Sequence, residues 1–267
     1  LCMPSPTPHH EDSVPGVPGV PRSSREPSFT DRRDGPVQGG QEGEIFGLYG
    51  LVGAGRTELL ETIFGVRTRA AGRVYVNEHL MNFSTAAEAM DHGFAMITEE
   101  RKANGLFLKG DLTFNTTIAN LNQYKAGPIL SDPKMTKATV NELKVMNTKA
   151  QGPSDLISSL SGGNQQKVVV AKWLERDTDI LIFDEPTRGI DVGAKDEIYT
   201  LLENLAQQGK AIIVISSELP EVLRLANRIA VMAHGRIIGT LDNEEATQEN
   251  IMELATVGQE EANGVNA

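Results

Sequence analysis

The chain has 267 residues, of which 39% are hydrophobic and 23% are charged, a composition typical of one α/β domain with a substantial core. Its formal net charge of -11 argues against a nucleic-acid partner, because phosphate backbones would be repelled over most of the surface. The single cysteine, Cys2, permits no internal disulfide, so we expect a reducing compartment. The apolar run from Ala211 to Ile215 is far shorter than the ~20 residues of a membrane helix, so the sequence predicts no membrane span.

Residues 1–42 contain eight of the thirteen prolines and show neither a helical nor a strand period in their apolar residues. We therefore expect this segment to be disordered, or foreign to the domain that follows it. The chain begins at Leu1 rather than at a methionine, and it lacks the charged-then-apolar pattern of a signal peptide. We interpret it as a piece of a longer protein that is not exported.

A buried strand is predicted from Glu44 to Tyr49, followed by a glycine-rich loop and an amphipathic helix from Glu58 to Phe64. The loop has the spacing G-x-x-x-x-G-K-[ST], in which backbone N–H groups bind phosphates and the hydroxyl ligates Mg²⁺. An arginine stands at the lysine position, and its larger, planar guanidinium does not reproduce the point contact of an ammonium. The alternative is a glycine-rich turn without a ligand. The residues predicted to bind nucleotide are Gly50, Leu51, Val52, Gly53, Ala54, Gly55, Arg56 and Thr57, with Thr57 also a metal ligand.

A hairpin with its turn at Asn77-Glu78 and a short helix from Ser84 to His92 are expected to be scaffold. The strand predicted from Phe94 to Ile97 ends in a charged cluster, residues 99–102. Within this cluster Glu99 could ligate a metal ion, or the whole cluster could be a solvated turn of ion pairs. The sequence leaves both alternatives open.

The stretch from Leu160 to Asp191 carries the most informative pattern in the chain. It opens with Leu-Ser-Gly-Gly, where Ser161 is expected to cap the N-terminus of a helix. The two glycines leave the backbone N–H groups of this terminus exposed, and such a terminus attracts phosphate. The apolar run Ile180 to Phe183 then predicts a buried parallel strand that delivers two carboxylates to its C-terminal edge. Asp184 is assigned the metal role, and Glu185 is assigned the role of the catalytic base that polarises a water for attack on a γ-phosphate.

Beyond this stretch the pattern alternates between helices and strands. The helix from Lys195 to Gln207 is amphipathic, and the strand from Ala211 to Ile215 ends in two serines. The last predicted elements are a strand from Ile229 to Met232, a turn at His234, an edge strand from Arg236 to Gly239, and a disordered tail over residues 257–267.

The sequences LSGGNQQK and DEPTRGID resemble the signature motif, the Walker B motif and the D-loop of an ATP-binding cassette, the nucleotide-binding domain of membrane transporters. The resemblance extends from about Gly43 to Leu254. It implies an α/β fold of the P-loop NTPase type, with a mostly parallel sheet flanked by helices. It also implies a cassette domain over residues 43–256 and a small helical subdomain over about 104–165.

Three residues depart from the pattern of this family. Arg56 replaces the lysine of the phosphate loop, Glu99 replaces a glutamine that touches Mg²⁺, and Ser217 replaces the histidine at the switch position. With the sequences GLVGAGRTE and DEPTRGIDVGAK, this combination is similar to the second cassette of importers for galactose/methyl galactoside, ribose and xylose, which carry two cassettes in one polypeptide. The family also places a base-stacking aromatic before the phosphate loop, where this chain has only Phe29.

The resemblance implies an ATPase subunit at the cytoplasmic face of the cell membrane that binds ATP and Mg²⁺. Its implied partners are membrane permease subunits, a second ATP-binding cassette and, indirectly, a sugar-binding protein, with no nucleic acid. The chain's own site would hydrolyse ATP slowly, while its signature would act in trans on ATP held by the second cassette. Two alternatives are a regulatory cassette that never hydrolyses ATP and a soluble cassette of translation or DNA repair, which the acidic charge disfavours. The residues assigned to the trans role are Ser161, Gly162, Gly163 and Gln165, with Asp191 in the D-loop.

Overall fold

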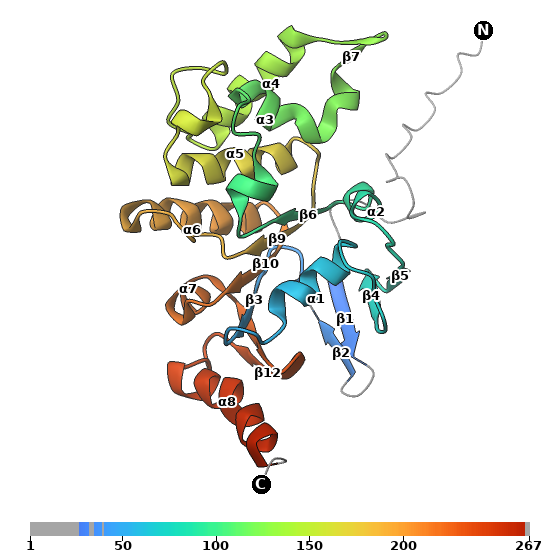
Figure 1. The fold of residues 1–267 in the computed structure, drawn as a ribbon, viewed down its shortest axis with the longest axis vertical. Helices are drawn as coiled ribbons and strands as arrows, with labels where there is room; N and C mark the ends of the chain where they lie inside the picture. Colours follow the sequence, from blue (N-terminus) through green and yellow to red (C-terminus); the bar gives the residue numbers. More distant parts are fainter. Residues whose placement is uncertain (1–26, 32–34, 39, 265–267) are drawn as a thin grey trace, which may run out of the picture.

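The computed structural model of the chain describes residues 27–31, 35–38 and 40–264, and a six-stranded sheet lies at its centre (Figure 1). The strands lie in the order β12 (Arg236–Asp242), β11 (Arg228–Ala233), β3 (Ile45–Gly50), β10 (Ala211–Ser216), β9 (Ile180–Asp184) and β6 (Phe94–Ile97). The five strands from β11 to β6 are parallel, and β12 pairs antiparallel with β11. The C-terminal ends of β3, β10, β9 and β6 therefore meet at one edge, where an open α/β sheet binds its ligands.

A second sheet of four antiparallel strands stands beside the first. Its order is β2 (Gly35–Gln38), β1 (Pro27–Asp31), β4 (Arg73–Val76) and β5 (His79–Met81). The predicted hairpin turn joins β4 to β5, with both Asn77 and Glu78 at positive φ, 49° and 63°, as a type I′ turn requires.

The expectation of disorder over residues 1–42 is wrong where the structure describes this segment. β1 pairs with β2 and with β4, and Phe29 lies opposite Val74 in that register. Backbone hydrogen bonds to a neighbouring strand hold these residues, and they require no apolar period in the sequence. Residues 1–26 lie outside the described residues.

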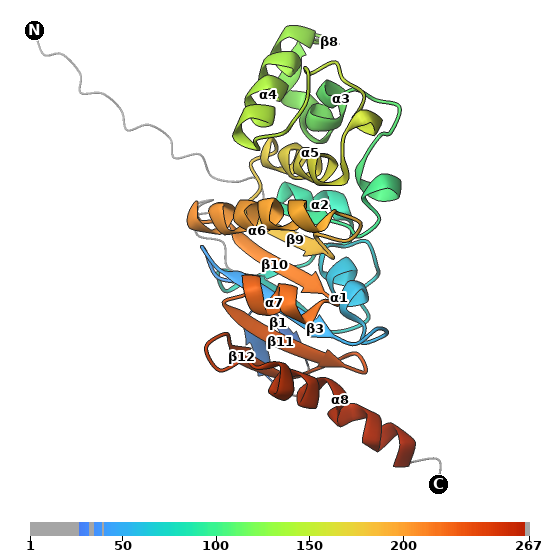
Figure 2. The ribbon, with the colours of Figure 1, turned by 90° about the vertical axis from the view of Figure 1, so that its left-hand side faces the viewer.

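Helices cover both faces of the central sheet (Figure 2). α1 (Arg56–Ile63) and α2 (Ala86–Asp91) pack on one face together with the antiparallel sheet, and α5 (Gly162–Leu174) and α6 (Val192–Gln207) pack on the other. α2 is capped by Thr85, one residue later than the predicted Ser84, because the Thr85 hydroxyl accepts from the Glu88 amide.

The remaining helices at the β11 side are α7 (Leu219–Leu225) and α8 (Gln248–Gly264). α8 overturns the prediction of a disordered tail from residue 257, since the helix continues to Gly264. Its first turns bury Ile251 and Ala255 against β11, and this packing orders the helix. Residues 265–267 lie outside the described residues.

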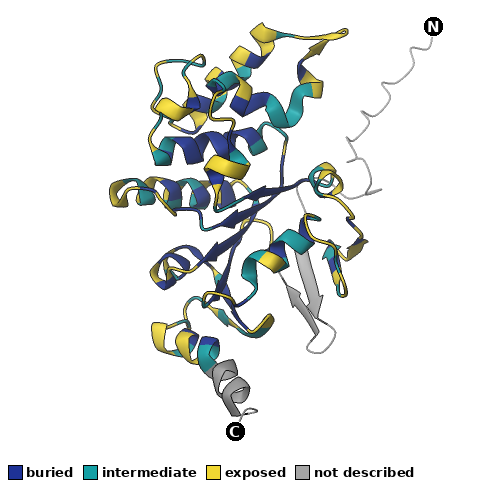
Figure 3. Ribbon diagram, viewed as in Figure 1, coloured by how far each residue is buried: buried dark blue, intermediate teal, exposed yellow. Residues whose placement is uncertain are grey.

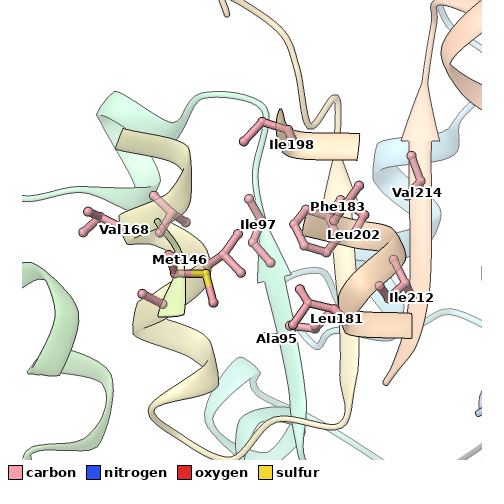
Figure 4. Close-up of a cluster of buried hydrophobic side chains, with 14 of the residues drawn as sticks. Ala95, Ile97, Met146, Val168, Leu181, Phe183, Ile198, Leu202, Ile212 and Val214 are labelled. Carbon is pink, nitrogen blue, oxygen red and sulfur yellow. The ribbon is translucent and has the colours of Figure 1, made fainter. Parts of the chain in front are cut away.

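The core is divided by the sheet into two main clusters, as the two-residue period of a strand requires (Figure 3). Along β9, Ile180 and Ile182 face α1, while Leu181 and Phe183 face α5 and α6 (Figure 4). All five residues of this strand are buried, including Asp184 at its end. The central strands are therefore continuous apolar runs, which made them readable from sequence.

A helical layer lies beyond α5, in the stretch 104–165 where a helical subdomain is predicted (Figure 1). Leu143 and Met146 lie there in one buried cluster with residues of α5. Among the described residues, no helix combines the length and the apolarity that crossing a bilayer requires. The elements of this layer are the π-helical turn η2 (Arg101–Gly105), α3 (Leu112–Thr117), the 3-10 segment η3 (Ile118–Tyr124), the strands β7 (Lys125–Ala126) and β8 (Ile129–Leu130), α4 (Asp132–Val145) and the 3-10 turn η4 (Ile157–Ser159).

Gly47→Ala tests how tightly α7 packs on β3. A Cβ at Gly47 would lie 2.7 Å from Val222 Cγ1 and 2.8 Å from Ala226 Cβ. We predict that this variant lowers the free energy of unfolding, measured with urea, by about 1–3 kcal/mol through overpacking. The matched control is Gly193→Ala at the exposed start of α6, where no described atom lies within 4 Å of the added carbon. The control should be neutral or slightly stabilised, and equal unfolding energies for the two variants would contradict the packing.

Candidate nucleotide-binding site

The glycine-rich loop lies between β3 and α1, at the C-terminal edge of the sheet. Gly53 and Gly55 have φ of 84° and 90°, a left-handed region that favours glycine. A Cβ at Gly50 would lie 2.5 Å from the Met232 carbonyl oxygen, so a larger residue does not fit there. The loop leads into the N-terminus of α1, whose free N–H groups form an anion-binding site.

Thr57 and Asp184 come together across the sheet edge. The Thr57 hydroxyl donates a 3.0 Å hydrogen bond to Asp184 Oδ2. Asp184 is 3% exposed, and this burial raises its pKa to about 6, although the Thr57 hydrogen bond opposes the shift. Its second oxygen, Oδ1, is buried and has no hydrogen-bond partner among the described residues.

This pair fits the predicted Mg²⁺ site. A hydroxyl and a carboxylate are the oxygen ligands that Mg²⁺ prefers, and the ion usually takes only one or two protein ligands. The unpartnered Oδ1 of Asp184 is an acceptor that a cation would satisfy. Thr57 and Asp184 are therefore the residues able to hold the ion.

Glu185 directly follows Asp184 in a strained backbone conformation, with φ of 51°. Non-glycine residues in this region are uncommon and cluster at functional sites. Its Oε1 accepts a 2.8 Å hydrogen bond from the Ser217 amide, so the switch position orients Glu185 through the backbone. The Ser217 side chain itself is exposed.

Arg56 spans the same edge of the sheet. Its Nη1 donates to the Ser216 carbonyl oxygen at 2.7 Å, and its Nη2 lies 3.8 Å from Glu185 Oε1. The side chains of Arg56 and Glu185 are each 10% exposed, so this ion pair is largely shielded from water. The guanidinium therefore binds protein acceptors, including the residue that we predict to be the base.

Glu99 is paired with the guanidinium of Arg188 in the loop after β9. This contact matches the ion-pair alternative for the charged cluster. The metal-ligand role of Glu99 stays a prediction, because Glu99 would first have to leave Arg188.

The predicted signature residues differ in how far they are exposed to solvent. Ser161 is exposed, and its hydroxyl accepts from the Asn164 side chain at 2.9 Å. Gly163 is buried, and a Cβ there would lie 3.2 Å from Ala194 Cβ. Gln165 is 4% exposed, and its amide donates to two carbonyl oxygens of this same chain, at residues 157 and 160. In this structure Gln165 is therefore engaged within its own chain, and its contact with a second cassette stays a prediction.

Gly162 is surrounded by its own chain. A Cβ at this position would lie 2.8 Å from Arg101 Nη2 and 2.9 Å from the Gly189 carbonyl oxygen. The predicted D-loop residue Asp191 is exposed, directly before α6. Of the residues assigned to the trans role, Ser161 and Asp191 are therefore the exposed ones.

Arg101 is the functional candidate that the sequence did not reveal. Its charged neighbours predict a solvated turn, yet Arg101 is 8% exposed and donates two hydrogen bonds to the loop after β9. No periodic or motif signal marks this residue, because its acceptors lie 87 and 88 positions later in the chain.

Comparison with known proteins agrees with this geometry. A family model described as ABC transporter matches residues 40–188, more than half of the chain. The chain therefore belongs to the ABC transporter family. The predicted family is confirmed at this level, and the position of the chain as the second cassette of a two-cassette importer stays a prediction.

Relatives of known name cover most of this chain. It is 54% identical over 215 residues to a protein of Treponema pallidum (strain Nichols) named galactose/methyl galactoside import ATP-binding protein MglA, an alignment covering 80% of this chain and 43% of the relative. It is 47% identical over 227 residues to a protein of the same name from Clostridium perfringens (strain 13 / Type A), covering 85% of this chain and 44% of the relative. The chain thus spans less than half the length of these relatives.

Solved structures confirm the predicted fold. A nucleotide-free ATP-binding cassette from an ABC transporter superposes with a TM-score of 0.71 at 19% identity, covering 87% of this chain and 95% of that one. The ADP conformation of MJ1267, an ATP-binding cassette of an ABC transporter, gives a TM-score of 0.69 at 20% identity, covering 88% of this chain and 96% of that one.

The buried Asp184 predicts a specific pH dependence of stability. Its pKa is raised on folding, so the neutral form contributes stability that is fully present below about pH 4 and is lost as pH rises through about 6. Asp184→Asn keeps an acceptor for Thr57 and carries no charge. In metal-free buffer, its free energy of unfolding should rise relative to wild type by up to about 3 kcal/mol between about pH 4 and about pH 7.

Asp196→Asn, at an exposed position on α6, is the matched control and should show no such divergence. Urea unfolding across this pH range checks the prediction. Parallel curves for Asp184→Asn and wild type would contradict the burial of a charged carboxylate at this site.

Proposed function

We propose that this chain is an ATP-binding cassette of a monosaccharide importer, which binds Mg-ATP at its phosphate loop and hydrolyses it slowly. The observation that carries this proposal is the Thr57–Asp184 contact, with its unpartnered carboxylate oxygen, beside a glycine loop at a helix N-terminus. The relatives named galactose/methyl galactoside import ATP-binding proteins, 54% and 47% identical, support the sugar as the cargo.

The chain's residues have separate parts in binding and hydrolysis. Backbone N–H groups from Gly50 to Thr57 bind the phosphates of ATP, and Thr57 and Asp184 hold the metal ion. Mg²⁺, when bound there, neutralises charge on the β- and γ-phosphates. Glu185, oriented by the Ser217 amide, accepts a proton from the attacking water.

Two features of the site support slow hydrolysis. Arg56 donates to Ser216 and lies beside Glu185, so its charge is directed at protein acceptors and not at a γ-phosphate. Ser217 carries no ring nitrogen that could hold a γ-phosphate. Each loss removes electrostatic stabilisation of the transition state.

The Arg56–Glu185 pair also favours a second function, a regulatory cassette that binds ATP without hydrolysing it. In that case Glu185, paired with Arg56, never activates a water molecule. The chain then contributes only through the conformation that it adopts with ATP bound. Turnover of the wild-type chain distinguishes the two functions, because the regulatory cassette would show none above a Glu185→Gln variant.

The partners that we propose are permease subunits and a second cassette, with a sugar-binding protein acting through the permease. Phe107 and Leu108 are exposed beside Phe114, whose ring meets that of Phe107 edge-on at 5.0 Å, and we assign this apolar cluster to the permease. Val52 in the phosphate loop and Val192 after the D-loop are 93% and 83% exposed, which supports a protein contact at the nucleotide edge. The implied location is the cytoplasmic face of the cell membrane.

The double substitution Arg56→Lys with Ser217→His tests the cause of slow turnover. It frees Glu185 from the guanidinium and adds a donor for the γ-phosphate, so we predict that kcat for ATP rises by roughly 10- to 100-fold. Each single substitution serves as a control and should give a smaller gain. Unchanged turnover in a double variant that still binds ATP would show that the site chemistry does not limit the rate.

Ser161 provides a cleaner test of the trans role than Gly162 does. A side chain at Gly162 would disturb Arg101 and Gly189 in its own chain, whereas Ser161 is exposed. We predict that Ser161→Ala in the importer assembled with its permease and second cassette lowers ATP-driven sugar uptake by about 10-fold. Nucleotide binding by the isolated chain should stay unchanged.

The exposed residue Ser158, three positions earlier, provides the control variant Ser158→Ala, which should match wild type in both measurements. Wild-type uptake by Ser161→Ala in vesicles would refute the trans role. Lost nucleotide binding would instead show that Ser161 supports the fold.

A further inference from the structure

The turn η2 is the first element of the helical layer after β6, and a buried cation lies at each of its ends. At its start, Arg101 is 8% exposed. At its end, the Gly105 carbonyl oxygen accepts a 2.8 Å hydrogen bond from Lys172, which comes from α5 and is also 8% exposed. The five residues of η2 are thus anchored to other elements at both ends, in a π-helical conformation that is rare and often found at functional sites.

Arg101 connects this turn to the D-loop. Its Nη1 donates to the Arg188 carbonyl oxygen at 2.7 Å, and its Nη2 donates to the Gly189 carbonyl oxygen at 3.0 Å. Two successive carbonyls thus accept from one rigid, planar guanidinium, a geometry that the ammonium of lysine does not reproduce. Two residues earlier, just before η2, the Glu99 carboxylate pairs with the Arg188 side chain, so residues 99 and 101 together bind both the side chain and the backbone of the D-loop.

The same guanidinium also contacts the start of the signature helix. Arg101 Nη2 lies 2.8 Å from the position that a Cβ of Gly162 would occupy, so a side chain there would displace the guanidinium from its present position. The Gly189 carbonyl oxygen, which accepts from Nη2, lies 2.9 Å from that same position. The η2 turn, the D-loop and the N-terminus of α5 therefore meet on one side chain.

We infer that Arg101 is a positioning residue, which fixes the D-loop and the N-terminus of the signature helix as one unit for presentation to nucleotide on a second cassette. It acts through Gly162 and the two D-loop carbonyls. The exposed residues Ser161 and Asp191 project from the two parts that Arg101 joins. This inference rests on the proposed function, because it is the trans site that needs the two loops in fixed register.

Hydrogen exchange of the whole chain tests the connection itself. Arg101→Met removes both donors, and Arg101→Lys keeps the charge without the two-pronged geometry. We expect the Arg188 and Ile190 amides, which bond within the D-loop, to exchange at least about 10-fold faster in Arg101→Met and about 3-fold faster in Arg101→Lys. The backbone amide of Gln165, in the first turn of α5, should also exchange faster than in wild type. The backbone amide of Leu59 in α1 should exchange at its wild-type rate.

Lys102→Met, at the exposed neighbour on the same turn, is the matched control and should exchange as wild type does. Wild-type exchange at the D-loop in both Arg101 variants would overturn the connection. If Arg101→Met fails to fold, the D-loop exchange rates of Arg101→Lys alone are compared with those of wild type, and wild-type rates would again overturn the connection.

Kinetics of the assembled importer test the positioning role. We expect Arg101→Lys to lower kcat for ATP by about 10-fold while KM for ATP stays within about 2-fold, because the phosphate loop lies elsewhere. Faster D-loop exchange with unchanged kcat would overturn the positioning role. The proposed function fails separately, if Ser161→Ala supports sugar uptake at the wild-type rate. In that case the hydrogen-exchange result still tests whether Arg101 connects the two loops.

Discussion

The buried carboxylate of Asp184, bonded through one oxygen to Thr57, is the interaction on which the nucleotide site depends. It joins the helix that follows β3 to the end of β9, although β10 lies between the two strands. A carboxylate so far from water is costly, and the hydrogen bond from Thr57 offsets part of that cost. The remaining oxygen has no hydrogen-bond partner among the described residues, so the burial that weakens the fold leaves an acceptor available to the Mg²⁺ that we propose.

Around this contact the chain divides its nucleotide chemistry between two places. At the phosphate loop, Arg56 is engaged with Ser216 and Glu185, which restrains the chain's own chemistry. At the signature, Ser161 remains exposed while Gly162 packs on Arg101. The proposed trans role accounts for this division, because in that role the N-terminus of α5 would serve nucleotide held by a second cassette.

The sequence predicted the central strands well, and β6 from Phe94 to Ile97 agrees at both ends, because buried parallel strands are continuous apolar runs. It also predicted that Thr57 and Asp184 share one edge, since strand ends meet there. β1 and β2 were missed because backbone pairing with another strand leaves no apolar period. The roles of Arg56 and Arg101 were missed because their acceptors lie 160 and 87 positions away, where no local pattern reports them.

Calorimetric titration of the chain with ATP, with and without Mg²⁺, tests the nucleotide site most directly, because it depends on the glycine loop, Thr57 and Asp184 together. The wild-type chain should bind ATP with Mg²⁺ present, and chelating the metal should weaken binding by at least about 10-fold, or about 1.4 kcal/mol. Asp184→Asn should show the weak affinity whether or not the metal is present. Equal affinities for wild type and Asp184→Asn in the presence of Mg²⁺, or no detectable binding by wild type, would contradict the assignment of Asp184 as the metal ligand of an ATP site.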